Sequence, residues 1–157
     1  MLLLHINDLI LKTMSINTPE LYDDENIFAK ILREEIPCTK VFEDDLTLAF
    51  MDIMPQGDGH TLVIPKFPTI DLFGLPDSLL GDYMTTIKKV ATAVKTAMQA
   101  EGVKVFQFNG AAAGQTVFHL HFHILPVTNG ASQPHARVAA DPNNIEQFAK
   151  RIRDALD

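Results

Sequence analysis

Apolar positions along the chain fall into segments with helical spacing and segments that resemble strands. The first helix is predicted to begin after the capping residues Asp23 and Asp24 and to end before Pro37. A long helix is predicted over residues 77–101, with Gly102 as its stop, and a last helix begins at Asp141-Pro142. The apolar faces of the three helices are Ile27, Phe28, Ile31 and Leu32; Leu80, Met84, Ile87, Val90, Val94 and Ala97; and Ile145, Phe148, Ala149, Ile152 and Leu156.

Between these helices, runs rich in β-branched and aromatic residues indicate strands. They lie at residues 39–43, 47–52, 60–65, 103–109 and 117–125. Short turns, such as the one predicted at 44–46, and a single long helix connect them. This order predicts an α+β domain with a mainly antiparallel five-stranded sheet packed by the long helix. We expect one domain over residues 23–157 and a flexible arm over residues 1–22, where Met14 is an alternative start.

Composition narrows the possible partners. The chain has 157 residues, of which 46% are hydrophobic, and a net charge of −7 with scattered Lys and Arg residues. Nucleic-acid backbones are bound by clustered basic residues, so we expect no nucleic-acid partner. The sequence has no apolar run long enough to span a membrane. Cys38 is the only cysteine, which excludes an intramolecular disulfide and favours a cytoplasmic protein with an inert thiol.

Candidate chemistry lies in the last predicted strand, which contains His119, His121 and His123. Alternate residues of a strand share a face, so the three imidazoles would line one surface, with Phe118 among the apolar residues of the other face. At about 3.3 Å per residue, the outer two histidines would be about 13 Å apart and could not share one metal ion. An adjacent pair could still bind zinc with help from His60 or a carboxylate. Neutral imidazole can also attack phosphorus without a separate base.

The loop before this strand suits an anion. Gly110 and Gly114 allow backbone N–H groups to approach a phosphate closely, and Asn109, Gln115 and Thr116 add polar side chains. The loop and the histidines together favour a metal-free nucleophile acting on a phosphate.

The sequence His119-Leu-His-Phe-His-Ile-Leu125 resembles the signature of the histidine-triad (HIT) superfamily. Further segments also resemble the family: residues 26–37, 43–45, 48–53, 60–66 and 109–116. The resemblance therefore covers about residues 24–126. It implies a HIT-like fold, a homodimer whose subunits join their sheets, and the activity of the small Hint-like nucleotide hydrolases.

The resemblance also implies residue roles. His121 would be the nucleophile that forms a covalent nucleotidyl intermediate, with His119 holding it, His123 contacting the phosphate and His60 relaying or orienting protons. The remaining predicted site residues are Asn109, Gly114, Gln115 and Thr116 around the phosphate, Asp52 at the ribose, and Ile27, Phe28, Ile31, Phe50 and Ile53 around the base. The expected substrates are purine nucleoside phosphoramidates or dinucleoside polyphosphates, with no cofactor and no metal.

Three departures from the family pattern bear on this hypothesis. Pro68 stands where many members have a relay histidine, and Asn26 and Ala29 stand where some have a zinc-binding cysteine pair. The segment from Pro126 onward differs from that of the phosphoramidase branch. Two alternatives therefore stay open: a nucleotide-binding regulatory dimer with little turnover, and a zinc-dependent hydrolase.

Overall fold

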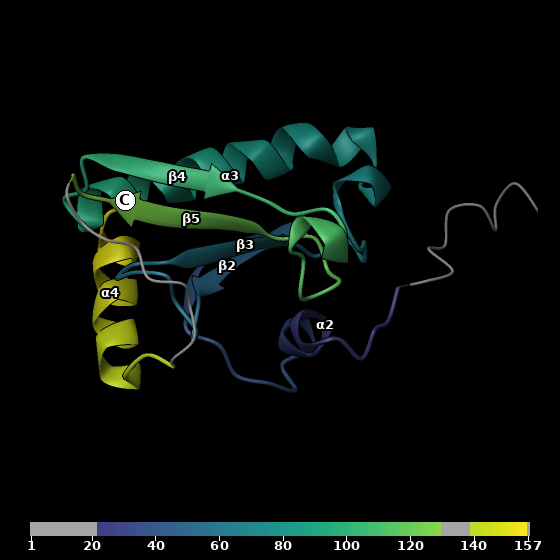
Figure 1. Ribbon diagram of the computed structural model, residues 1–157, viewed down its shortest axis with the longest axis horizontal. Helices are drawn as coiled ribbons and strands as arrows, with labels where there is room; N and C mark the ends of the chain where they lie inside the picture. The colour runs from purple at the N-terminus through teal and green to yellow at the C-terminus, as the bar shows by residue number, and fades with distance from the viewer. Residues whose placement is uncertain (1–21, 130–138, 157) are drawn as a thin grey trace, which may run out of the picture.

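A computed structural model describes residues 22–129 and 139–156 (Figure 1). Its centre is the five-stranded antiparallel sheet that the sequence predicted, and the strand order is β1-β2-β3-β5-β4. The strands are β1 (Lys40–Glu43), β2 (Thr47–Met51), β3 (Thr61–Pro65), β4 (Gly102–Phe106) and β5 (Phe122–Val127). Asp44 makes the predicted β1–β2 turn, where its carboxylate accepts hydrogen bonds from the N–H groups of Leu46 and Thr47.

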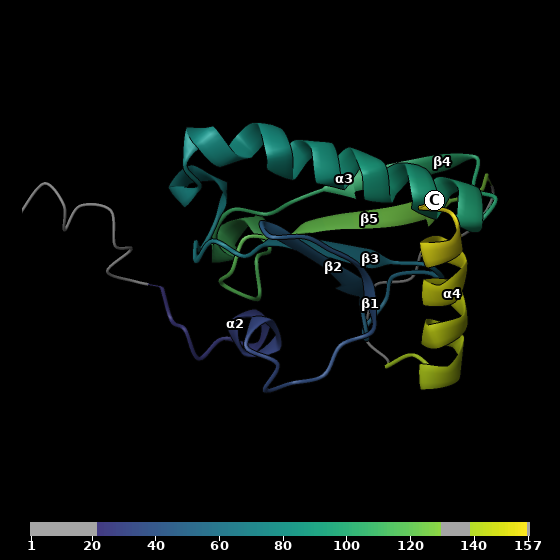
Figure 2. The ribbon, with the colours of Figure 1, turned by 180° about the vertical axis from the view of Figure 1, so that it is seen from behind.

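The helices occupy both sides of the sheet (Figures 1 and 2). The long helix α3 (Asp77–Ala97) lies along one face, and the short helix α2 (Ile27–Leu32) lies on the opposite side. Helix α4 (Pro142–Asp154) stands at one end of the sheet and contacts β1 and α3. No helix in the described ranges is long and apolar enough to cross a lipid bilayer.

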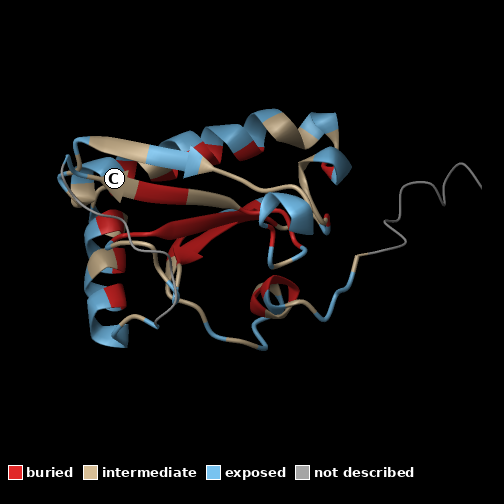
Figure 3. Ribbon diagram, viewed as in Figure 1, coloured by how far each residue is buried: buried red, intermediate tan, exposed pale blue. Residues whose placement is uncertain are grey.

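Because helices cover both faces, the central strands are buried on both sides (Figure 3). Alternate residues of β2 and β3 enter two separate cores. Ala49 and Val63 pack with α3, whereas Leu48, Phe50 and Leu62 pack with Phe28 and Ile31 of α2. The second core places α2 on the sheet face to which His123 belongs, because His123 pairs with Leu62 across β3 and β5.

Helix ends differ from the sequence prediction in both α2 and α3. Helix α2 ends at Leu32, well before Pro37, and Glu34 just beyond it takes a positive φ of 60°. Asn26, not Asp23 or Asp24, caps α2, since its side-chain oxygen accepts hydrogen bonds from the N–H groups of Phe28 and Ala29. Helix α3 ends at Ala97 rather than near residue 101, because Gln99 takes a positive φ of 51°. Gly102 consequently begins β4 and does not stop the helix.

The largest correction concerns the histidine strand. Strand β5 begins at Phe122, not at residue 117, so His119 and His121 precede it. The ladder stops because the Leu120 N–H donates to the carbonyl of Thr69 and the Pro65 carbonyl accepts from the His119 ring. Phe118 is therefore 41% exposed instead of lying on the apolar face. Strand β4 is also shorter than predicted and ends at Phe106. In the loop that follows, the side-chain amide of Gln107 donates to the side-chain oxygen of Asn109.

Candidate active site

A cavity of about 620 Å³ opens between α2, the end of β2 and the segment that leads into β5. The sequence-predicted residues that line it are Ile27, Phe28, Ile31, Phe50, Asp52, Ile53, Gly114, Thr116, His121 and His123. His60, His119, Asn109 and Gln115 lie outside this lining. The cavity is therefore mainly apolar and has two imidazoles and one carboxylate at its wall, a composition typical of small-molecule sites.

The ring of His121 is oriented by the backbone. Its Nδ1 lies 2.7 Å from the His119 carbonyl oxygen, which can only accept, so Nδ1 carries the proton and Nε2 keeps its lone pair. The ring of Phe28 packs edge-on against His121, with 5.0 Å between centroids. This arrangement fixes the tautomer that a nucleophilic imidazole needs.

His119 is fully buried behind His121 and bonds on both sides. Its Nε2–H donates to the Pro65 carbonyl at 2.9 Å. Its Nδ1 lies 2.6 Å from the hydroxyl of Tyr22, which therefore donates to it. The family resemblance implied that His119 holds His121; here the contact runs through the His119 backbone carbonyl rather than its ring.

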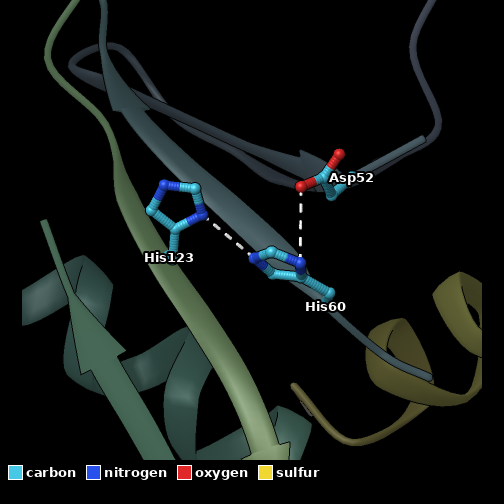
Figure 4. A group of neighbouring side chains, drawn as sticks. All are labelled: Asp52, His60 and His123. Atoms are coloured by element: carbon cyan, nitrogen blue, oxygen red, sulfur yellow. Dashed lines mark hydrogen bonds and ion pairs between the residues drawn. The ribbon is translucent and has the colours of Figure 1, made fainter. Parts of the chain in front are cut away.

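His123, His60 and Asp52 form a chain of polar contacts (Figure 4). His123 Nδ1 lies 3.0 Å from His60 Nε2, and His60 Nδ1 lies 3.3 Å from an Asp52 carboxylate oxygen. The Gln56 N–H also donates to His60 Nδ1 at 3.1 Å, which puts the His60 proton on Nε2 and makes it the donor to His123. The remaining nitrogen of His123, Nε2, then carries a proton. Phe106 stacks on the His123 ring with 4.6 Å between centroids.

All four of these histidines favour the neutral form. Burial is the main cause and lowers the pKa of His119 to about 4 and that of His123 to about 3. Burial also lowers the pKa of His121 and of His60, while the Asp52 carboxylate acts in the opposite direction on both. The imidazoles are therefore uncharged at neutral pH, and the lone pair of His121 is available.

The glycine loop between β4 and β5 is held by side-chain amides. Gln115 accepts from the Gly110 N–H through Oε1 and donates through Nε2 to the carbonyls of Ile70 and Val117. Asn109 Oδ1 accepts from the Leu72 N–H and from Gln107 Nε2. Gly110 and Gly114 have φ values of 89° and 101°, so the loop requires glycine at both positions.

Comparisons with known proteins agree with this geometry. Residues 33–130 match the family described as HIT domain. The chain belongs to the HIT family. It is 40% identical over 146 residues to an adenosine 5'-monophosphoramidase of Saccharomyces cerevisiae, covering 93% of this chain and 90% of that protein. A second relative, an adenylylsulfatase of Arabidopsis thaliana, is 38% identical over 102 residues, with 64% of this chain and 51% of that protein covered.

Solved structures of HIT proteins show the same fold. A Hit-like protein of Bartonella henselae, described as involved in cell-cycle regulation, superposes with a TM-score of 0.79 at 48% identity, covering 85% of this chain and 98% of the other. A zinc-bound histidine-triad family protein of Mycobacterium smegmatis superposes with a TM-score of 0.75 at 34% identity, covering 84% and 93%.

Zinc in a HIT relative raises the question of which residues here could hold a metal. Asp52, His60 and His123 bring their ligand atoms within 4.8 Å of one another, and imidazole and carboxylate both bind zinc. His60 lies between the other two and turns a different nitrogen to each of them (Figure 4). The three side chains meet at a corner, and one ligand atom from each is close enough to the other two to share an ion. An ion on His60 Nε2 would replace its hydrogen bond to His123, and an ion on Nδ1 would replace the hydrogen bond from the Gln56 N–H.

Several residues of this HIT site were missed from the sequence. Ile36, Pro37 and Cys38 line the cavity beside α2, and burial raises the pKa of the Cys38 thiol, which agrees with an inert group. Phe108 also lines the cavity. Phe106 and Phe108 alternate in the sequence shortly before the histidines, and this pattern could have indicated that Phe108 belongs to the site. Tyr22 gave none, because the sequence placed it in the arm.

Proposed function

We propose that this protein hydrolyses nucleoside phosphoramidates through a covalent nucleotidyl intermediate on His121. The observation that carries the proposal is the hydrogen bond from His121 Nδ1–H to the His119 carbonyl, which leaves the Nε2 lone pair on a residue that lines the cavity. In the first step Nε2 attacks the α-phosphorus; the Nε2–P bond forms, the P–N bond breaks, and the amine leaves after taking a proton from solvent. In the second step water attacks the phosphorus and gives one proton back to solvent, the Nε2–P bond breaks, and a nucleoside monophosphate is released.

The other site residues have matching roles in this scheme. His123 Nε2–H faces the reaction as a donor to the phosphate oxygens, and Gly114 and Thr116 of the cavity wall bind the same phosphate. Asn109 and Gln115 act indirectly: their side-chain amides make hydrogen bonds that hold the loop in shape. The hydrogen bonds of His123, Asn109 and Gln115 support the roles proposed for these three residues.

The nucleoside would occupy the apolar part of the cavity. A purine fits between the side chains of α2 and those at the end of β2, namely Ile27, Phe28, Ile31, Phe50 and Ile53. Asp52 lies where the apolar wall meets His123, so its carboxylate can accept from ribose hydroxyls. His60, directly behind Asp52 and His123, would orient or pass protons between them.

The charge of the cavity favours an uncharged or cationic leaving group. No Lys or Arg of the described residues lines it, so nothing there neutralises the additional phosphates of a dinucleoside polyphosphate. We therefore expect a higher kcat/KM for adenosine phosphoramidate than for a dinucleoside polyphosphate. The naming of the yeast relative as an adenosine 5'-monophosphoramidase supports the same choice.

Two broader proposals accompany this function. We propose that the protein is a homodimer whose sheets join through the edge strand β4, where Val105 is exposed, and that it acts in the cytoplasm. Sedimentation equilibrium tests the dimer: a monomer at micromolar concentration would refute it.

The decisive experiment is intact-protein mass spectrometry during turnover of adenosine phosphoramidate. The wild type should gain one AMP group transiently, and His121→Ala should show neither the adduct nor turnover while it still binds AMP and unfolds cooperatively. AMP binding without any turnover by the wild type would instead favour a binding protein. Turnover by His121→Ala would refute the mechanism.

A further inference from the structure

Tyr22 connects the N-terminal end of the described chain to the histidine site. Its hydroxyl lies 2.6 Å from His119 Nδ1, and the two rings meet edge-on with 5.6 Å between centroids. Tyr22 is not among the residues that line the cavity. Its hydroxyl therefore meets the site through His119.

His119 needs a donor at Nδ1 because of its other contact. The Pro65 carbonyl can only accept, so it requires the proton on Nε2 and leaves a lone pair on Nδ1. The side chain is fully buried, so water does not satisfy that lone pair, and an unpaired buried acceptor is destabilising. Tyr22 supplies the donor. Burial raises the pKa of its hydroxyl, which keeps the proton in place.

The position of Tyr22 is fixed by the start of helix α2. The backbone N–H and the side-chain amide of Asn26 both donate to the Asp23 carbonyl, closing a turn next to Tyr22. The same Asn26 caps α2, whose Phe28 packs on both His119 and His121. The hydroxyl is thus delivered to His119 by the element that also forms the cavity wall.

We propose that Tyr22 is a positioning residue, whose hydroxyl holds the ring of His119 so that the His119 carbonyl keeps the His121 nucleophile in its reactive tautomer. The proposal rests on the proposed role of His121. With the hydroxyl removed, His119 can turn or exchange its tautomer to satisfy Nδ1, and the carbonyl that receives His121 Nδ1–H moves with it. The N-terminal boundary of the functional unit then includes Tyr22.

The chain offers a matched pair of variants, because it has two tyrosines. Tyr22→Phe removes the hydroxyl and keeps the ring. Tyr83→Phe removes a comparable buried hydrogen bond, from the Tyr83 hydroxyl to the Val63 carbonyl at 2.7 Å in the α3 core. Two-bond 1H–15N spectra of the imidazoles report the tautomer and hydrogen bonding of His119 and His121 independently of turnover.

We expect Tyr22→Phe to shift the His119 Nδ1 resonance and to lower kcat by about tenfold, the value of one hydrogen bond, with a smaller change in KM. Tyr83→Phe should lower thermal stability but leave both resonances and kcat unchanged. An unchanged Nδ1 resonance or an unchanged kcat in Tyr22→Phe would overturn the proposal, as would an equal loss of kcat in both variants. Failure of the underlying mechanism is seen separately, as turnover by His121→Ala.

Discussion

Acid should destabilise this protein through its buried histidines, and the contribution of His119 can be isolated. The residue is fully buried, and both of its ring nitrogens are engaged, one as a donor to Pro65 and one as an acceptor from Tyr22. A second proton would have to go on Nδ1, where the Tyr22 hydroxyl already points. The folded protein therefore resists protonation that the unfolded chain accepts readily.

The size of this effect follows from the two pKa values. In the unfolded chain His119 has its ordinary pKa of 6.5, and in the folded protein burial lowers it to about 4. Between these values the unfolded state binds more protons, so stability is fully present above pH 6.5 and is lost as the pH falls toward 4. The shift corresponds to about 3 kcal/mol by pH 4, a large part of a typical domain's stability.

Urea denaturation at pH 7, 6, 5 and 4 measures this loss, and His119→Gln isolates the residue. A glutamine amide can donate to the Pro65 carbonyl and accept from Tyr22, but it does not titrate. The wild type should lose about 3 kcal/mol more than His119→Gln between pH 7 and pH 4. The same pH dependence in both proteins would show that His119 does not cause this loss. Should the variant not fold, an NMR titration of His119 in the wild type measures the folded-state pKa directly, and a value near 6.5 would exclude the effect.

Three further predictions follow from the site. Because burial lowers the pKa of His121, the acid limb of the kcat profile should have its midpoint below pH 6.5; a midpoint above 7 would contradict a neutral, buried nucleophile. Gly114→Ala should cost about 1–2 kcal/mol in thermal unfolding and reduce kcat, since its φ is 101°, whereas Gly81→Ala in open space on α3 should stabilise the protein by about 0.5–1 kcal/mol. Chelator-treated protein should keep its kcat for adenosine phosphoramidate; a loss that zinc restores would support the metal alternative.

Sequence reasoning succeeded where periodicity alone determines the structure. Alternation through residues 120–124 correctly separated Leu120 and Ile124, which enter the α3 core, from His123, which faces the opposite side. The spacing of Ile27, Phe28 and Ile31 likewise placed one face of α2 on the sheet, although not every residue is buried. Both successes concern the direction of side chains, which the spacing of apolar and polar residues indicates directly.

What the sequence did not show are contacts that depend on where a backbone ladder stops. No sequence pattern indicates that the Thr69 carbonyl accepts from the N–H of Leu120, or that the Gln115 amide closes the glycine loop. Tyr22 was missed for the same reason. Its partner His119 is 97 positions away, and no periodicity connects them.

The tautomer of His121 depends on the place where the structure departs from the predicted strand. In a strand running through residue 119, the His119 carbonyl would be free to join the ladder to a neighbouring strand. In the structure, β3 and β5 pair only as far as Val63 and Phe122, and the His119 carbonyl instead accepts from the ring of His121. The late start of β5 at Phe122 therefore has a chemical consequence. It converts a backbone carbonyl from a structural acceptor into the group that directs the lone pair of His121 Nε2 away from the backbone.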